Sequence, residues 1–176
     1  MLEHFLSDLN WIDRTILIWI NHAWATQLLN YFFFGVTFSA SWLGVMLYAG
    51  VDILMIADRK WKAGFLFTLI LTGVISESMK IIVNRERPYQ LMHLITPFGT
   101  PGLDPSFPSG HTSFAFAIAS SVETRSRSIL FYSWAFAVGL SRLYLGVHYP
   151  SDVVGGMLVG ILTGKMVKLL SGGKNE

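Results

Sequence analysis

The chain has 176 residues, of which 52% are hydrophobic and only 14% are charged, whereas about a quarter of the residues in a soluble domain are charged. So few charged side chains cannot cover a surface that faces water, and the composition therefore predicts a single membrane-embedded domain over residues 1–176 rather than a soluble globular protein. A net charge of +2 argues against nucleic-acid binding, and the absence of cysteine excludes disulfides, thiolate metal sites and cysteine nucleophiles.

Residues 1–27 are predicted to form an amphipathic helix that lies at the membrane interface. Apolar side chains recur there at intervals of three and four residues, and the charged side chains occupy other positions. The segment has neither a basic start nor a small-residue cleavage site, so it is not interpreted as a signal peptide. The polar residues 21–27 are expected to break the chain, because the uncharged run Thr15–Val51 is far longer than the roughly 20 residues of one span.

The remaining sequence predicts five transmembrane helices, or six if residues 9–27 also insert. The five spans are Leu28–Ala57, Ala63–Ile82, Pro108–Val122, Ile129–Val147 and Pro150–Leu170. The last one carries glycines at a spacing of four, which predicts close packing against a neighbouring helix; they are Gly156, Gly160 and Gly164. The predicted fold class is therefore an all-α integral membrane protein, a bundle of five or six transmembrane helices with an amphipathic interfacial helix at the N-terminus.

The basic residues near the ends of the spans predict the orientation of the bundle. Seven of them gather on one side, namely Arg59, Lys60, Lys62, Arg125, Arg127, Lys168 and Lys174. The opposite side has Arg14 and Arg85, apart from three cations that are assigned to a site below. Because an excess of Lys and Arg marks the cytoplasmic side, we expect the loop 83–107 and the turn 147–151 to face out of the cytoplasm together.

Two cations follow the second span on this outer side. Lys80 and Arg87 are seven residues apart, which is about two helical turns, so we expect them to project from one helix face until Pro88 ends the helix. Glu77 precedes Lys80 by one turn and is expected to pair with it. Taken alone, the two cations would equally fit side chains that only reach toward the membrane surface.

The long loop 83–107 ends in a pattern that is typical of an anion site. Pro108 is suited to the start of a helix, which would place Ser109 and Gly110 in the first turn with His111 directly after them. The free backbone N–H groups of such a turn attract an anion, and glycine lets the anion approach closely. By itself, the pattern would also fit an ordinary helix cap.

A third cluster surrounds the last turn on the outer side. Arg142 lies near the end of the fourth span, His148 in the turn, and Asp152 in the first turn of the fifth span. The spacing of four lets the Asp152 carboxylate accept from one ring nitrogen of His148 and leaves a lone pair on the other. Three cations meeting at one membrane face need a counter-charge, and a phosphate group supplies it.

Together, the three clusters resemble the signature of the type 2 phosphatidic acid phosphatase family, whose wider superfamily includes acid phosphatases and vanadium haloperoxidases. The matching residues are Lys80-x6-Arg87-Pro88, Pro108-Ser109-Gly110-His111 and Ser141-Arg142-x5-His148-x3-Asp152. The resemblance implies that His148 is the nucleophile of a phosphohistidine mechanism, oriented by Asp152, with His111 as general acid and then base. It also implies a set of phosphate-binding residues: Lys80, Arg87, Ser109, Gly110 and Arg142.

The resemblance further implies a metal-independent hydrolase without a cofactor, acting on a phosphorylated lipid at the outer face of the bacterial cytoplasmic membrane. The three cations agree with the absence of a metal, since they would repel a divalent ion. Lipid A 1-phosphate and undecaprenyl pyrophosphate are the favoured substrates, with phosphatidylglycerol phosphate and phosphatidic acid as others, and the oligomeric state stays open. Two alternatives are a vanadate-dependent haloperoxidase and a non-catalytic lipid-phosphate binder or transporter, although a pure binder would not require His111, His148 and Asp152.

Overall fold

The computed structural model describes residues 2–23, 25–55, 59–99, 102–122 and 125–170, and within these ranges it contains helices and loops but no strand. The helices are α1 (Leu2–Ala23), α2 (Gln27–Ser39), α3 (Trp42–Met55), α4 (Arg59–Val83), α5 (Pro88–Leu91), α6 (Gly110–Ser121), α7 (Arg125–Tyr144) and α8 (Pro150–Leu170). The all-α prediction is therefore confirmed for the described part of the chain.

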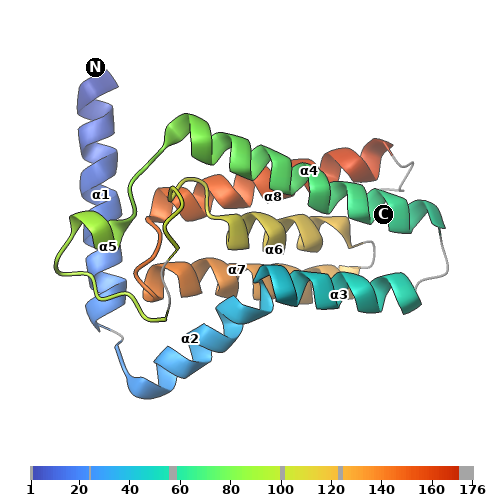
Figure 1. Ribbon diagram of the computed structural model, residues 1–176, viewed down its shortest axis with the longest axis horizontal. Coiled ribbons are helices and arrows are strands. Elements are labelled where there is room, and N and C mark those ends of the chain that lie inside the picture. The colour runs from blue at the N-terminus through green and yellow to red at the C-terminus, as the bar shows by residue number, and fades with distance from the viewer. Residues whose placement is uncertain (1, 24, 56–58, 100–101, 123–124, 171–176) are drawn as a thin grey trace.

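Helix α6 forms the centre of the bundle. All ten of its residues from Thr112 to Ser121 are buried, and it packs against α4, α7 and α8 (Figure 1). The glycines of α8 allow this contact, since a Cβ on Gly160 would lie 2.3 Å from the carbonyl oxygen of Ser113. The predicted close packing along the glycine face of α8 is therefore confirmed, and it fixes the first turns of α6 and α8 side by side.

The predicted span Leu28–Ala57 is not one continuous helix, and Ala57 itself lies outside the described residues. The segment divides into α2 and α3, with a bend of 58° between them. Two serines stabilise the break: the Ser39 hydroxyl donates to the carbonyl oxygen of Val36 over 2.7 Å, and the Ser41 hydroxyl accepts from the N–H of Gly44 over 3.3 Å. The bend turns α2 across the end of the bundle (Figure 1).

One helical segment in the described part of the chain is long and apolar enough to cross a membrane. It is Lys62–Leu91, which contains most of α4 together with α5. The bent pair of α2 and α3 is a second candidate. The other predicted spans also coincide with helices, namely α6, α7 and α8. Because only two candidates in the described part of the chain meet the length and hydropathy of a membrane span, the total of five or six spans stays a prediction.

Helix α1 runs crosswise to the bundle at the end where α5 lies (Figure 1). Its inner face buries Leu17 and Ile20 in a cluster with the segment that joins α7 to α8, while Trp11 and Trp19 are exposed on its outer face. An amphipathic helix perpendicular to the membrane-crossing helices would lie in the plane of the interface. The predicted break near residues 21–27 is confirmed, because α1 ends at Ala23 and α2 begins at Gln27.

Candidate active site

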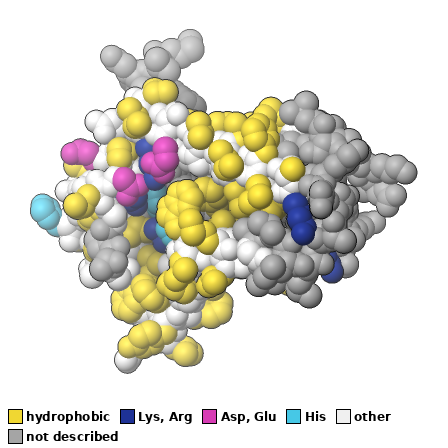
Figure 2. Space-filling model, turned by 45° about the vertical axis from the view of Figure 1, so that its right-hand side comes forward, with side chains coloured by type: hydrophobic (Ala, Val, Ile, Leu, Met, Phe, Trp, Pro, Cys, Tyr) yellow, Lys and Arg dark blue, Asp and Glu magenta, His cyan; other side chains and the backbone are white. Residues whose placement is uncertain are grey.

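A cavity of about 380 Å³ opens at the end of the bundle where α4 and α7 end and α6 begins. Figure 2 shows acidic, basic and histidine side chains gathered at a hollow among hydrophobic side chains. The charged, histidine and glycine residues that line this cavity are Glu77, Lys80, Arg87, Gly102, Asp104, Gly110, His111, Arg142 and His148. The structure thus brings the three predicted cations, both predicted histidines and Gly110 together.

His148 and Asp152 adopt the arrangement that their spacing suggests. The Nδ1 atom of His148 lies 3.5 Å from Oδ2 of Asp152, which is an ion-pair distance rather than a short hydrogen bond. The Nε2 atom lies 3.2 Å from Nη1 of Arg87. Because arginine can only donate, Nε2 must be the accepting nitrogen, and the ring proton belongs on Nδ1, on the side of Asp152. The lone pair of His148 therefore faces the cavity.

The surroundings of His148 keep its imidazole neutral. Burial lowers the pKa of His148 to about 4; the neighbouring Asp152 opposes this shift, and the positive charges of Arg142 and Arg87 add to it. A neutral imidazole retains the lone pair that a nucleophile needs. At neutral pH the imidazole of His148 therefore carries no positive charge.

This pKa predicts the acid limb of the activity profile. Below the pKa of His148 the ring is protonated and cannot attack, so kcat/KM should fall with decreasing pH around a midpoint of about 4 rather than near 6.5, the ordinary value for histidine. Phosphate release measured in detergent from pH values below this midpoint up to neutral pH checks this. A midpoint near the ordinary histidine value would contradict it.

Arg87 reaches the cavity by a different route from the predicted one. Helix α4 ends at Val83, where Asn84 takes a left-handed conformation with φ 45°, and Arg87 lies beyond it at the N-cap of α5. The prediction that Lys80 and Arg87 share one helix face was therefore wrong. The guanidinium also donates from Nη1 to the carbonyl oxygen of Val147 over 3.0 Å, which fixes it beside His148.

The start of α6 is also shifted from its predicted position. The helix begins at Gly110, with Ser109 as its N-cap, and Pro108 precedes it. The backbone N–H of Ser109 donates to the carbonyl oxygen of Asp152 over 3.0 Å. Ser109 therefore ties α6 to α8 and does not offer its N–H to a phosphate as predicted. Gly110 and His111 line the cavity from the first turn, where helix N–H groups have no partner within the helix.

Sequence reasoning missed Asp104, which comes from the long loop and neutralises the cations of the cavity. Its carboxylate lies 2.6 Å from Nζ of Lys80 and 2.8 Å from Nη2 of Arg87. Partial burial raises the pKa of Asp104, but the contacts with Lys80 and Arg87 outweigh it and lower this pKa to about 2. Lys80 also pairs with Glu77 over 2.9 Å, which confirms the predicted pair.

Arg142 connects the cavity to the bent helix α2. Its Nη1 atom donates to the hydroxyl of Thr37, while its Nε atom is buried without a hydrogen-bond partner among the described residues. Thr37 was not singled out from the sequence, because only the bend between α2 and α3 brings it to the site. The Nε donor of Arg142 is thus a buried polar group without a hydrogen bond among the described residues, beside the cavity that the side chain lines.

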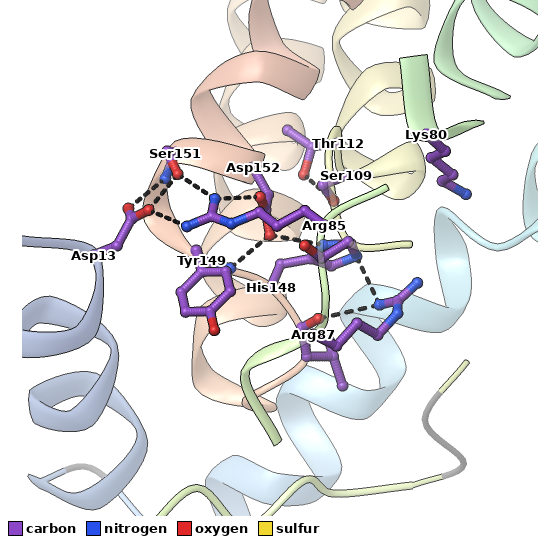
Figure 3. Close-up of polar contacts among 12 residues, drawn as sticks. Asp13, Lys80, Arg85, Arg87, Ser109, Thr112, His148, Tyr149, Ser151 and Asp152 are labelled. Carbon is purple, nitrogen blue, oxygen red and sulfur yellow. Dashed lines mark hydrogen bonds and ion pairs between the residues drawn. The ribbon is translucent and has the colours of Figure 1, made fainter. Parts of the chain in front are cut away.

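The sequence analysis also missed Asp13 and Arg85, which lie behind His148. Arg85 contacts Asp13 and Asp152 over 2.7 Å each, as Figure 3 shows. Nothing in the sequence joins α1 to this turn, since Asp13 and Ser151 are 138 residues apart. Within the described residues, no group of three or more His, Cys, Asp or Glu side chains is arranged to hold a metal ion.

Comparisons with known proteins agree with this geometry. Residues 61–176 match the model of the PAP2 superfamily. A lipid A 4'-phosphatase of Bacteroides thetaiotaomicron is 30% identical, over 91% of this chain and 75% of the relative. The undecaprenyl-diphosphatase BcrC of Bacillus subtilis is 31% identical, over 92% of this chain and 76% of the relative.

Two solved structures share the fold. The crystal structure of Aquifex aeolicus LpxE has a TM-score of 0.80 and 26% identity, covering 88% of this chain and 93% of that one. A transmembrane PAP2-type phosphatidylglycerolphosphate phosphatase from Bacillus subtilis has a TM-score of 0.78 and 21% identity, covering 98% and 89%. Because the family model matches more than half of this chain, the chain belongs to the PAP2 superfamily.

Proposed function

We propose that this protein is a membrane enzyme that removes phosphate from a phosphorylated lipid through a phosphohistidine intermediate. The observation that carries the proposal is the lone pair of His148, which faces a cavity lined by Lys80, Arg87 and Arg142. Three cations attract a phosphate group and stabilise the charge that develops on it during transfer. The names of the relatives support the same class of reaction, since both are phosphatases of lipid-linked phosphate.

In the first step, the Nε2 lone pair of His148 forms a bond to phosphorus, and the bond between phosphorus and the leaving oxygen breaks. His111 donates a proton to that oxygen, which leaves as the lipid alcohol or, from a pyrophosphate, as the lipid monophosphate. Lys80, Arg87 and Arg142 bind the other phosphoryl oxygens, together with the backbone of Gly110. The phosphate must replace the carboxylate of Asp104, which contacts Lys80 and Arg87 in this structure.

In the second step, a water molecule attacks the phosphohistidine and gives a proton to His111. A bond from oxygen to phosphorus forms, the bond from Nε2 to phosphorus breaks, and inorganic phosphate is released. Asp152 keeps the imidazole oriented through both steps and stabilises the positive charge of the phosphorylated ring. No step calls for a metal ion, since the cations of the cavity and the imidazole of His111 supply the charge and the proton.

A second cavity supports a lipid as the substrate. It has a volume of about 660 Å³, lies between α3 and α4, and is lined almost entirely by apolar residues. Trp42, Glu77 and Phe114 line both this groove and the phosphate cavity, so the two are adjacent. A lipid whose hydrocarbon chain lies in the groove would have its phosphate group beside Lys80. Lipid A 1-phosphate and undecaprenyl pyrophosphate are the favoured substrates. The name of the Bacteroides relative supports a phosphate of lipid A, and the name of BcrC supports undecaprenyl pyrophosphate.

Filling this groove should separate lipid substrates from soluble ones. A Cβ on Gly73 would meet Phe114 at 3.4 Å and Trp42 at 3.8 Å, which is ordinary contact. Gly73→Ala should therefore be tolerated, whereas the ring of Gly73→Phe would enter the groove and lower kcat/KM for lipid phosphates by roughly tenfold or more. Hydrolysis of para-nitrophenyl phosphate by both variants is the control. Equal losses for lipid and soluble esters would contradict a tail-binding groove.

We place the cavity at the outer surface of the bacterial cytoplasmic membrane, within a single domain of residues 1–176. The count of basic residues supports this orientation, and the crosswise α1 at the same end supports an interfacial position (Figure 1). At this surface the phosphate would be in contact with water while the lipid tails stay in the bilayer.

The test is phosphate release by the purified full-length protein in EDTA, measured with lipid A, undecaprenyl pyrophosphate, phosphatidylglycerol phosphate and phosphatidic acid. We expect turnover of at least one of them. Activity that is lost on chelation and restored by Mg²⁺ or Zn²⁺ would contradict the metal-independent mechanism. Lipid binding without phosphate release would instead support a binder or transporter, and halide oxidation by peroxide after addition of vanadate would support a haloperoxidase.

A further inference from the structure

A network of charged residues lies behind the cavity and joins the nucleophile to α1 (Figure 3). Arg85 is its centre: Nη2 lies 2.7 Å from Oδ2 of Asp13, and Nη1 lies 2.7 Å from Oδ1 of Asp152. The two carboxylates are nearly inaccessible to solvent, with exposed fractions of 1% for Asp13 and 0% for Asp152. Buried charges persist only when they are paired, so the three residues depend on one another.

The contacts of Asp152 show how the network acts on the nucleophile. Its Oδ1 atom accepts from Arg85, whereas its Oδ2 atom accepts from the N–H of Tyr149 over 2.8 Å and faces Nδ1 of His148. Each oxygen therefore has a separate partner. Arg85 fixes the rotation of the carboxylate and, with it, the position of the oxygen that faces the imidazole.

Arg85 is itself held from several sides. Nη1 also donates to the hydroxyl of Ser151 over 2.6 Å, and its guanidinium carbon lies 3.9 Å from the ring centre of Tyr149. Asp13 accepts from the N–H of Ser151 over 2.8 Å and from the hydroxyl of the same residue. A planar guanidinium can contact two carboxylates and a hydroxyl at once, which the single ammonium group of a lysine does less well.

We propose that Arg85 is a positioning residue for the phosphatase reaction and that Asp13 holds it in place, so that α1 contributes to the chemical step. Arg85 is not among the residues that line the phosphate cavity, and it reaches the reaction only through Asp152. The inference rests on the proposed function, in which His148 is the nucleophile.

The effect should fall on the chemical step and not on the binding of phosphate. As Nε2 bonds to phosphorus, positive charge develops on the imidazole, and Oδ2 of Asp152 must stay near Nδ1 to stabilise it. Without Arg85, the carboxylate can rotate and loses its balancing cation. Lys80, Arg87 and Arg142, by contrast, stay in place to bind the phosphate.

The experiment compares Arg85→Gln, Arg85→Lys and Asp13→Asn with the wild-type full-length protein. Glu86→Gln is the matched control, since Glu86 adjoins Arg85 but its side chain is exposed and makes none of these contacts. The measurements are kcat and KM with the lipid that the wild type hydrolyses, inhibition by inorganic phosphate, and the rate of phosphohistidine formation per phosphate-binding site. The last measurement separates a slow chemical step from a loss of folded protein.

We expect Arg85→Gln to lower kcat and the rate of phosphohistidine formation by roughly 10- to 100-fold, as for other residues that orient a functional histidine. Asp13→Asn should give a smaller loss of the same kind, and Arg85→Lys an intermediate one. KM and inhibition by inorganic phosphate should stay within about twofold of the wild type, and so should all values for the Glu86→Gln control.

Unchanged phosphohistidine formation in Arg85→Gln would overturn the inference, and so would an equal loss of affinity for inorganic phosphate, which would place Arg85 in the phosphate site itself. If Arg85→Gln does not fold, Asp13→Asn and Arg85→Lys decide by the same criteria. If the wild-type protein releases phosphate and the Arg85 and Asp13 variants match its kcat and its rate of phosphohistidine formation, the inference is overturned but the proposed function stands. A wild-type protein that forms no phosphohistidine overturns the proposed function together with it.

Discussion

Replacing His148 with alanine should abolish phosphate release, with a loss of about 10⁴-fold or more, because the substitution removes the atom that attacks phosphorus. The side chain is buried at the base of the cavity, and its Nε2 atom is the one that meets Arg87. Removal of the ring leaves the three cations in place, so the phosphate site should survive. The variant should therefore still bind inorganic phosphate or the lipid substrate.

Two measurements check this prediction. Rapid quenching in base with a radiolabelled substrate should trap a base-stable, acid-labile phosphoenzyme in the wild type but none in His148→Ala. His93→Ala is the matched control, because His93 is an exposed histidine of the long loop and does not line the phosphate cavity. Turnover by His148→Ala at the rate of this control would eliminate the covalent mechanism.

The site could be predicted from the sequence where its residues share one short local structure. His148 and Asp152 lie in one turn and the helix that follows it, so their spacing of four already predicts their approach. The glycine face of α8 is similar, since its period of four places three small residues on one side of a helix. In both cases the period of the helix determines the geometry, and no knowledge of the tertiary structure is required.

The sequence could not predict contacts that depend on where a helix ends. A period of seven suggested one helix face for Lys80 and Arg87, but the left-handed Asn84 ends α4 between them. The break between α2 and α3 was hidden for the same reason, because an uncharged run carries no information on where two serines can cap a helix end. Helix ends depend on such local hydrogen bonds, and hydrophobicity does not reveal them.

Long-range ion pairs were also beyond prediction. Asp13 was interpreted as part of the polar face of an interfacial helix, yet it is buried against Arg85 and Ser151. Arg85 was counted only among the basic residues on the outer side of the membrane. No ion-pair partner was predicted for Asp104. A carboxylate in a loop has no periodicity, so only the fold reveals that Asp104 lies between Lys80 and Arg87. The predicted cations therefore have counter-charges that the sequence did not disclose.

Replacing His111 with glutamine should produce a different defect from that of His148→Ala, because His111 acts on the leaving oxygen and on water rather than on phosphorus. The residue lies in the first turn of α6 and lines the cavity together with His148. Without a proton donor, a lipid alkoxide is a poor leaving group, and turnover of lipid phosphates should fall by roughly 10²- to 10⁴-fold.

The two steps can be separated by the choice of substrate. The nitrophenolate of para-nitrophenyl phosphate leaves without protonation, so His111→Gln should still form the phosphohistidine with this ester. Breakdown of the intermediate then lacks its general base, so the phosphoenzyme should accumulate to a level that quenching detects. A burst of nitrophenol that equals the amount of enzyme, followed by slow turnover, is the expected result. A variant that forms no phosphoenzyme with this ester would show that His111 is needed for attack itself, and the roles of the two histidines would have to be reassigned.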